Sequence, residues 1–325
     1  MTALGNLIRP LFTVSNKEST SFSAGDRQTA QRLETVVRMV TKGCQWTLQN
    51  SNFEALISRL DAVDPELRGF AYEGAGVGLG ALDCLFPWKS RTRAFLDGPG
   101  SDYIYAVPLG AGMALARLRR SPEKFLKQLD PVLGWLILDG YGFHEGFFAR
   151  RRHVVQRQVP AHLSAYARRV FDQGLGRSIW FSQGTTVKRV AATIASFPQS
   201  RQADLWGGVG LACSYTGGVE RPALKELYML VGQYRPALAL GIAIGANARH
   251  SVDNPWTNAE LACEVVWGLP SQMVSHMVDL ARENLPATSR EPAYEVWRQR
   301  IIASFDAPAT TTTRCSSSFF VRKEQ

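Results

Sequence analysis

The stretch RGFAYEGAGVGLGALDCLFP (residues 68–87) carries the pattern that decides the fold. Glycine recurs there at every second position among apolar residues, at Gly74, Gly76, Gly78 and Gly80. Glycine is unfavourable inside a helix, but it lets a neighbouring helix approach closely because it has no side chain. We therefore predict that this stretch is a helix packed tightly inside a helical protein.

The same stretch matches a relaxed dinucleotide-binding fingerprint, with Gly76, Gly78 and Ala81 at the required spacing. In dinucleotide-binding proteins this fingerprint follows a β-strand and opens a helix. No apolar strand pattern precedes Gly76, and a similar glycine-spaced segment recurs around Gly208. Helix packing explains these glycines better, and we predict no cofactor.

Apolar residues elsewhere follow helical periodicity. In QRLETVVRMVTKGCQWT, the residues Val36, Val40 and Cys44 lie four positions apart and share one helix face. The segment TNAELACEVVWGL opens with Thr257 and Glu260 at the spacing of a capping box, in which each side chain binds the other residue's backbone amide. These patterns predict an all-α fold. Further helices are expected at residues 53–63, 71–86, 103–118, 122–152, 161–171, 184–196, 203–215, 221–249 and 292–304.

Three blocks of sequence recur in the same order along the chain. Residues 68–87 resemble RSIWFSQGTTVKRVAATIASFP (residues 177–198), because both open with arginine and aromatics and close with Phe-Pro. The pair PLGAGMALAR and WGGVGLACSY follows, and then the pair LGWLILDGYGFHEGFF and RPALALGIAIGANAR. We interpret the recurrence as an internal duplication that gives a compact helical bundle with two pseudo-twofold-related halves. A cleft between such halves is a common place for a small-molecule site.

This division predicts a first helical half at residues 23–160 and a second at residues 161–305. Residues 1–22 are expected to form a flexible segment. The low-complexity composition of residues 306–325, which include APATTTTRCSSS, predicts that these residues form a disordered tail.

Bulk composition narrows the class of protein. A chain of 325 residues with 45% hydrophobic content can bury a large core. Its five cysteines are widely spaced, which is typical of reduced thiols in a cytoplasmic protein. Arg9 and Pro10 interrupt the apolar start that a secretion signal would need, and the sequence has no apolar run long enough for a membrane span. We predict a cytoplasmic protein without a membrane partner.

The formal net charge of +9 favours anionic partners. The interleaved aromatic and basic residues of single-strand binders are missing, however, and the sequence contains no recognisable nucleic-acid module. We therefore predict no nucleic-acid partner, while a homodimer is a candidate assembly. The arginines are grouped in three clusters: Arg117, Arg119 and Arg120; Arg150, Arg151 and Arg152; and Arg168 and Arg169.

Acids and a histidine inside apolar motifs are the candidates for chemistry, because a buried acid must be paired, hydrogen-bonded or neutralised. Glu73 lies in FAYEGAG, and Asp139, His144 and Glu145 lie in LILDGYGFHEGFF. Carboxylates and imidazole are the usual proton-transfer groups, so these four are candidate catalytic residues. The alternative is that the acids only form structural ion pairs with the arginines. The second half lacks counterparts of Asp139, His144 and Glu145, which favours the first half as the place for chemistry.

Candidate substrate-binding residues are mostly aromatic and lie in or beside the same motifs. They are Tyr72, Tyr141, Phe143, Asp204, Trp206 and Tyr215. The histidines lack metal-ligand spacing, and the sequence contains neither a nucleophile elbow nor a P-loop lysine. We predict no metal site.

The motifs FAYEGAG, LDGYGFHEGFF, GLGRSIWF and DLWGGVGLACSYTGG together resemble a bacterial family of unknown function whose members are often labelled enediyne biosynthesis proteins. The resemblance covers residues 68–249. It implies a role in specialised-metabolite biosynthesis, acting on a hydrophobic polyketide or polyene-like intermediate, with a polyketide synthase or tailoring enzymes as candidate partners. It brings no established catalytic residues.

Two hypotheses of different classes follow. In the first, the protein is a cofactor-independent cyclase or isomerase that holds an apolar intermediate in a central cavity and uses a buried carboxylic acid for proton transfer. In the second, it is a non-catalytic binding, chaperone or self-resistance protein for such an intermediate. An apolar cavity containing a protonated acid would favour the enzyme, whereas a cavity without polar groups would favour the binding protein.

Overall fold

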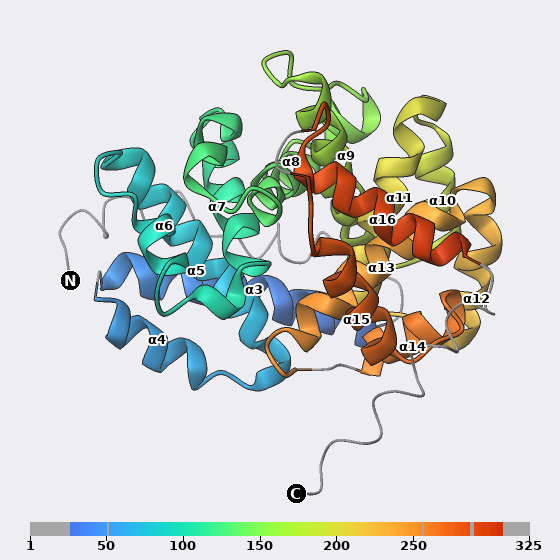
Figure 1. Cartoon of the computed structure of the whole chain (residues 1–325), viewed down its shortest axis with the longest axis horizontal. Coiled ribbons are helices and arrows are strands. Elements are labelled where there is room, and N and C mark those ends of the chain that lie inside the picture. Colours follow the sequence, from blue (N-terminus) through green and yellow to red (C-terminus); the bar gives the residue numbers. More distant parts are fainter. Residues whose placement is uncertain (1–26, 51, 255–256, 287–288, 308–325) are drawn as a thin grey trace, which may run out of the picture.

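The computed structural model describes residues 27–50, 52–254, 257–286 and 289–307. Within these ranges the chain forms helices and turns and no β-strand, so the predicted all-α fold is confirmed (Figure 1). The predicted flexible segment 1–22 and residues 308–325 of the predicted tail lie outside the described residues. The α-helices are α3 (Arg27–Gln49), α4 (Phe53–Asp61), α5 (Pro65–Leu85), α6 (Arg91–Leu96), α7 (Ala106–Arg117), α8 (Leu136–Phe148), α9 (Ala165–Ser182), α10 (Val187–Ala195), α11 (Gln199–Tyr215), α12 (Arg221–Leu230), α13 (Arg235–His250), α14 (Thr257–Val266), α15 (Ser271–Arg282) and α16 (Ala293–Asp306).

Seven of these helices form a continuous series in which each packs against the next, in the order α3, α5, α7, α8, α9, α11 and α13. The series curves back on itself. Arg249 near the end of α13 donates a hydrogen bond of 2.8 Å to the Glu66 carbonyl oxygen at the start of α5. Arg32 of α3 donates one of 2.7 Å to the Thr216 carbonyl oxygen just after α11. Among the outer helices, α16 crosses in front of α13 and packs against it (Figure 1).

Each contact in this series is built on glycine. A Cβ atom on Gly110 of α7 would lie 1.8 Å from the Glu73 carbonyl oxygen of α5, and one on Gly76 of α5 would lie 2.2 Å from the Val107 carbonyl oxygen of α7. Two residues span about 200° around a helix, so the glycines of a G-x-G pair face neighbours on opposite sides. The predicted role of glycine in close helix packing is therefore confirmed. The G-x-G pairs are Gly74 and Gly76, Gly110 and Gly112, Gly140 and Gly142, Gly174 and Gly176, and Gly208 and Gly210.

The same glycine contact recurs at each step of the helix series. The structure therefore allows the three matched sequence blocks to be compared. The match between residues 68–87 and 177–198 is wrong as a structural equivalence, because the first block is essentially one helix whereas the second runs from α9 through a turn into α10. The blocks at α7 and α11 both carry a G-x-G pair that contacts the helices before and after it, but α5, α8 and α9 carry such pairs too, so this feature does not test the match. A duplication into two pseudo-twofold halves stays a prediction.

Two of the long predicted helices are interrupted. The helix predicted at 122–152 breaks at Pro131, where the preceding Asp130 accepts hydrogen bonds from the backbone amides of Val132 and Leu133. The helix predicted at 221–249 breaks at Gly232, which has a φ of +56° that glycine adopts readily.

The start of α14 at Thr257 agrees with the prediction, but the capping box does not form as predicted. The Glu260 carboxylate accepts hydrogen bonds from the backbone amide, at 3.0 Å, and the hydroxyl of Ser271, at the start of α15. Glu260 therefore ties two helices together, a long-range partner that local spacing did not predict.

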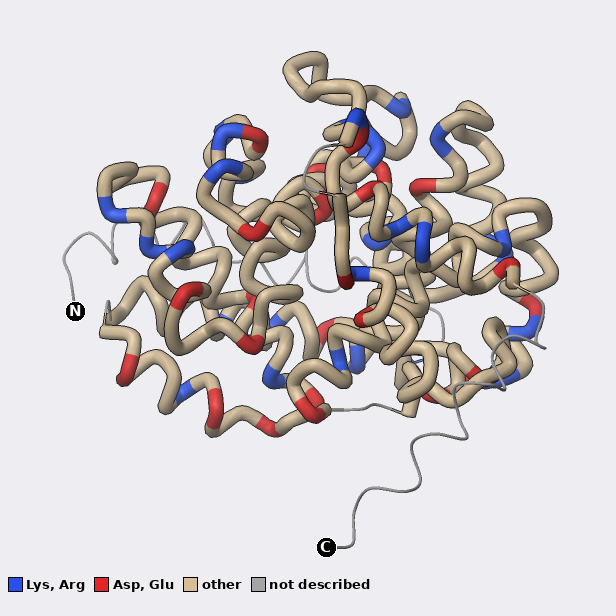
Figure 2. The backbone as a smooth tube through the Cα atoms, in the orientation of Figure 1, with Lys and Arg blue, Asp and Glu red and all other residues tan. Residues whose placement is uncertain are grey.

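Charged positions are spread over the whole view in Figure 2, and some of these residues are buried. Glu73, Asp139, Arg177 and Arg298 are all buried, which raises the question of how each is compensated. Among the described helices no single one is long and apolar enough to cross a membrane. The segments Arg221–Leu230 and Gly232–His250 reach the required length and composition only as a pair, which is bent by 108°.

Candidate functional site

A cavity lies among α3, α5, α7, α8 and α9. It offers about 90 Å³ to the centres of water molecules, several times the roughly 10–15 Å³ that one water needs. Most of its wall is aliphatic or aromatic. The lining residues are Val36, Val37, Val40, Thr41, Cys44, Phe70, Glu73, Val77, Met113, Arg117, Phe143, His144, Phe147, Phe148, Arg177 and Phe181.

Glu73 lines the buried part of this cavity, which we call its closed end, and is only 2% exposed. Its Oε1 atom accepts a hydrogen bond of 3.3 Å from Nη2 of Arg177, while its Oε2 atom makes no hydrogen bond within the described residues. Glu73 also borders a second apolar cavity of about 20 Å³, shared with Tyr105 and Tyr215. Burial raises the pKa of the Glu73 carboxyl; Arg177 lowers it, and the nearby Asp139 raises it further.

Glu73 belongs to a chain of buried polar groups that we call the cavity cluster: Glu73, Asp139, Gln173, Arg177 and Tyr294. The Asp139 carboxylate accepts hydrogen bonds of 2.7 Å from both Arg177 Nη1 and Gln173 Nε2. Gln173 also contacts the Tyr294 hydroxyl at 3.0 Å. Two carboxyls share one arginine, so this cluster is electrically neutral when one carboxyl holds a proton. The less well paired carboxyl is that of Glu73, which assigns the proton to it.

A second polar group, His144, lines the cavity close to Phe148, with ring centroids 4.7 Å apart. Its Nδ1 atom lies 3.4 Å from Glu145 Oε1, and the other carboxylate oxygen lies 2.9 Å from Nε2 of His153. His153 is oriented in turn by the carbonyl oxygen of Gln158, 2.8 Å from its Nδ1 atom.

Burial alone would raise the pKa of Glu145, but the contacts from His144 and His153 outweigh it and lower that pKa to about 2. Glu145 is therefore an ionised residue whose carboxylate lies within ion-pair distance of His144, without a hydrogen bond to it. The Nε2 atom of His144 makes no hydrogen bond within the part of the chain that the structure describes, so it can exchange a proton with a molecule in the cavity.

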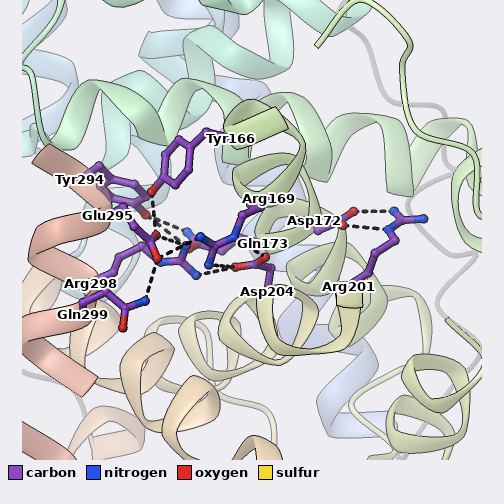
Figure 3. Close-up of polar contacts among 10 residues, drawn as sticks. All are labelled: Tyr166, Arg169, Asp172, Gln173, Arg201, Asp204, Tyr294, Glu295, Arg298 and Gln299. Atoms are coloured by element: carbon purple, nitrogen blue, oxygen red, sulfur yellow. Dashed lines mark hydrogen bonds and ion pairs between the residues drawn. The ribbon is translucent and has the colours of Figure 1, made fainter. Parts of the chain in front are cut away.

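A separate network of buried charges lies between α9, α11 and α16 (Figure 3). We call it the packing cluster: Tyr166, Arg169, Asp204, Glu295 and Arg298. Arg298 donates to Asp204 at 2.8 Å and to Glu295 at 3.0 Å, and Arg169 reaches the same two acids at 3.1 and 2.9 Å. Two arginines balance two carboxylates, and none of the five residues lines either cavity described above.

Comparison with known proteins assigns the chain to a family. The family model for DUF1702, a protein of unknown function, matches residues 3–305. The chain belongs to this family. Neither a search of curated protein sequences nor a search of solved structures found a match.

Among the catalytic candidates, this DUF1702 member places Glu73 and His144 at the cavity wall. Asp139 contacts Arg177, and Glu145 contacts His144, but neither acid lines the cavity. Each of the two acids can therefore affect a ligand only through the lining residue that it contacts. Phe143 lines the cavity, and the Arg177 guanidinium lies 5.0 Å from the centre of its ring.

The other substrate-binding candidates of the DUF1702 chain lie away from the main cavity. Tyr72 stacks on Tyr103 and donates a hydrogen bond of 2.7 Å to Asp61. Tyr215 borders the small second cavity, while Asp204 belongs to the packing cluster. Tyr141 and Trp206 are buried in the main core.

Arg177, Gln173 and His153 were missed as site residues. A signal was present for one of them: Gln173, like Glu73 and Asp139, stands directly before the first glycine of a G-x-G pair. That position lies about 100° from the first glycine and about 60° from the second, on the arc between them, so it points between the two neighbouring helices. The described residues contain no group of three or more His, Cys, Asp or Glu side chains that could hold a metal ion.

Proposed function

We propose that the protein is an enzyme that binds an apolar small molecule in the cavity and rearranges it by proton transfer, as an isomerase or a cyclase. The observation that carries this proposal is a carboxyl with a raised pKa at the closed end of an apolar cavity. An acid whose burial favours the protonated form is the group that acid catalysis needs.

Glu73 is suited to donate the proton. Transfer from Oε2 to one carbon of a substrate double bond leaves a Glu73 carboxylate and a carbocation at the other carbon. Arg177 already contacts Oε1 at 3.3 Å and stabilises the carboxylate as it forms. Asp139 holds Arg177 in this position from the other side, and so acts as a positioning residue.

His144 is suited to complete the reaction. Its free Nε2 atom can accept a proton from a carbon next to the cation, which forms a new double bond and an imidazolium paired with Glu145. Direct loss of that proton gives an isomer. Attack of a second double bond on the cation before the loss gives a ring. Either way the substrate gains one proton and loses one, and the imidazolium returns its proton to Glu73 through solvent.

The resemblance of the sequence motifs to proteins of enediyne gene clusters supplies a substrate class, a polyketide- or polyene-derived intermediate. Such a chain has the double bonds that the proposed chemistry uses, and it is apolar enough for the cavity wall. Polyketide synthases or tailoring enzymes would then supply or consume the molecule. A cytoplasmic location stays a prediction.

The test is metabolite profiling of the producing organism with the gene deleted and then restored as Glu73→Gln, His144→Gln or Glu123→Gln. We expect an unreacted intermediate to accumulate in the deletion strain and in the first two variants. Glu123→Gln, on the short helix Pro122–Gln128, should behave as wild type. A lower yield of an unchanged product, with all three variants fully active, would favour the non-catalytic binding protein instead.

A purified-protein assay separates catalysis from protection of an unstable molecule. The intermediate from the deletion strain is incubated with wild-type protein in deuterated water, and the product is examined by mass spectrometry. We expect one deuterium to enter per turnover, and none with Glu73→Gln. Product formation without deuterium incorporation would rule out Glu73 as a solvent-exchanging proton donor.

A further inference from the structure

The mouth of the cavity differs in chemistry from its closed end. Arg117, in the last turn of α7, and Phe148, at the end of α8, both line the cavity and are both exposed. The Arg117 guanidinium carbon lies 5.8 Å from the centre of the Phe148 ring. A cation held over an aromatic ring therefore stands where a bound ligand would meet solvent.

Positive charge continues from both of these residues along the chain. Arg119 and Arg120 follow Arg117, and Arg150, Arg151 and Arg152 follow Phe148. Arg119, Arg120, Arg150 and Arg151 are exposed and form no ion pair with the described acids. These four arginines thus add positive charge just after the ends of α7 and α8.

A negative charge would not be tolerated at the closed end. The Glu73 and Asp139 carboxyls already share the single cation Arg177 there, so an added anion would lose its hydration in an apolar, buried setting without gaining an unshared cation. The two ends of the cavity thus fix a direction, with apolar atoms beside Glu73 and an anionic group beside Arg117.

We propose that the cavity selects an amphipathic anion, a molecule with an apolar chain and one carboxylate or phosphate end that Arg117 binds at the mouth. This inference rests on the proposed function, because it takes the same cavity as the substrate site. Arginine suits the task because its planar guanidinium donates two parallel hydrogen bonds to a carboxylate or a phosphate. The surrounding arginines attract the anion toward the mouth.

The experiment measures the affinity of the purified full-length protein for dodecanoate, dodecyl phosphate and dodecanol by calorimetric titration at low and at high salt. We expect the anions to bind about tenfold more tightly than the alcohol at low salt, as one charge-assisted contact provides. The ratio between dodecanoate and dodecyl phosphate shows which anion the site prefers.

Three variants make the test specific. Arg117→Gln should remove the preference for anions and leave dodecanol binding unchanged, and Arg117→Lys should keep part of it. Arg93→Gln, which loses only an exposed ion pair with Asp97, should match the wild type. Equal affinity for anion and alcohol, or an unchanged preference in Arg117→Gln, overturns the inference but leaves the cavity as a binding site. Failure of all three probes to bind, or unchanged binding after Met113→Trp fills the cavity, overturns the proposed function as well.

Discussion

The cavity cluster and the packing cluster are built from the same side chains with opposite results. Both are buried arginine-carboxylate networks that involve α9. In the packing cluster two arginines meet two acids, and burial is offset so well that the pKa of Glu295 is lowered. In the cavity cluster one arginine meets two acids, and the pKa of Glu73 is raised. The ratio of cations to anions separates a network that joins helices from one that holds a proton next to a cavity.

The largest effect is expected from removing one charge of the packing cluster. Arg298→Met leaves the carboxylates of Asp204 and Glu295 buried with the half-exposed Arg169 as the one arginine still paired with them in the packing cluster. Breaking a buried pair in this way costs about 3–5 kcal/mol of unfolding free energy. Urea denaturation measures it. Arg93→Gln, in an exposed pair, should cost less than about 1 kcal/mol. Equal costs for the two variants would show that the packing cluster contributes no more than a surface pair.

The next largest effect tests the glycine contacts between the central helices that hold both clusters in place. In Gly208→Ala, the new Cβ would lie 1.8 Å from the carbonyl oxygen of Gln173, and relieving that contact moves α9 away from α11. We expect a loss of about 1–3 kcal/mol or more, because the clash is with backbone.

The adjacent Gly207 provides the matched control, since its Cβ would meet nothing closer than 3.6 Å. Gly207→Ala should be neutral or stabilising by up to about 1 kcal/mol, as alanine favours a helix. Thermal denaturation of the two variants compares them directly. Similar melting temperatures for both variants would contradict the conclusion that the central helices pack through glycine contacts.

The two clusters should respond to pH in opposite directions. The folded-state pKa of Glu73 is raised above 4.5, so its contribution to stability is complete below pH 4.5 and is lost as pH rises through the raised pKa. The pKa of Glu295 is lowered, so its contribution is present above pH 4.5 and is lost as pH falls through the lowered value. A tenfold difference in proton affinity between the folded and the unfolded chain corresponds to about 1.4 kcal/mol of unfolding free energy.

Unfolding free energies of wild type, Glu73→Gln and Glu295→Gln measured across pH reveal these slopes. The difference in unfolding free energy, wild type minus Glu73→Gln, should fall as pH rises. The difference wild type minus Glu295→Gln should increase as pH rises. Slopes of the same sign would remove the distinction between the clusters.

The smallest effect is expected for Glu73→Gln at pH 4.5 or below. Both side chains are then neutral and nearly equal in shape, so the unfolding free energy should change by less than about 0.5 kcal/mol. Combined with loss of the proposed activity, this result would mark Glu73 as a residue kept for chemistry. A loss of several kcal/mol would instead show that Glu73 supports the fold as an anion.

The sequence predicts features that depend on neighbouring residues, and it does not predict features that depend on contacts between residues far apart in the chain. Helical periodicity and paired glycines predicted the fold class and the close packing, because both follow from neighbouring residues. Glu73 and His144 are candidates in the sequence because a polar residue in an apolar motif is conspicuous, and both line the cavity, while their catalytic role stays a prediction. Arg177 was not a candidate, because its role depends on contacting Glu73, which is 104 positions away in the sequence. Asp204 looked like Glu73 in the sequence, and only its partners reveal the difference.

The glycine contacts of the central helices have a consequence for how such a protein diversifies. Because main chain touches main chain, the helix axes are fixed without help from the residues that face the cavity. Val37, Met113 and Phe147 are therefore free to exchange for larger, smaller or more polar residues without moving the scaffold. Relatives that keep the glycines can bind new ligands through changes in the cavity-lining residues alone. Sequence differences should therefore concentrate among the cavity-lining residues, while the glycines stay unchanged.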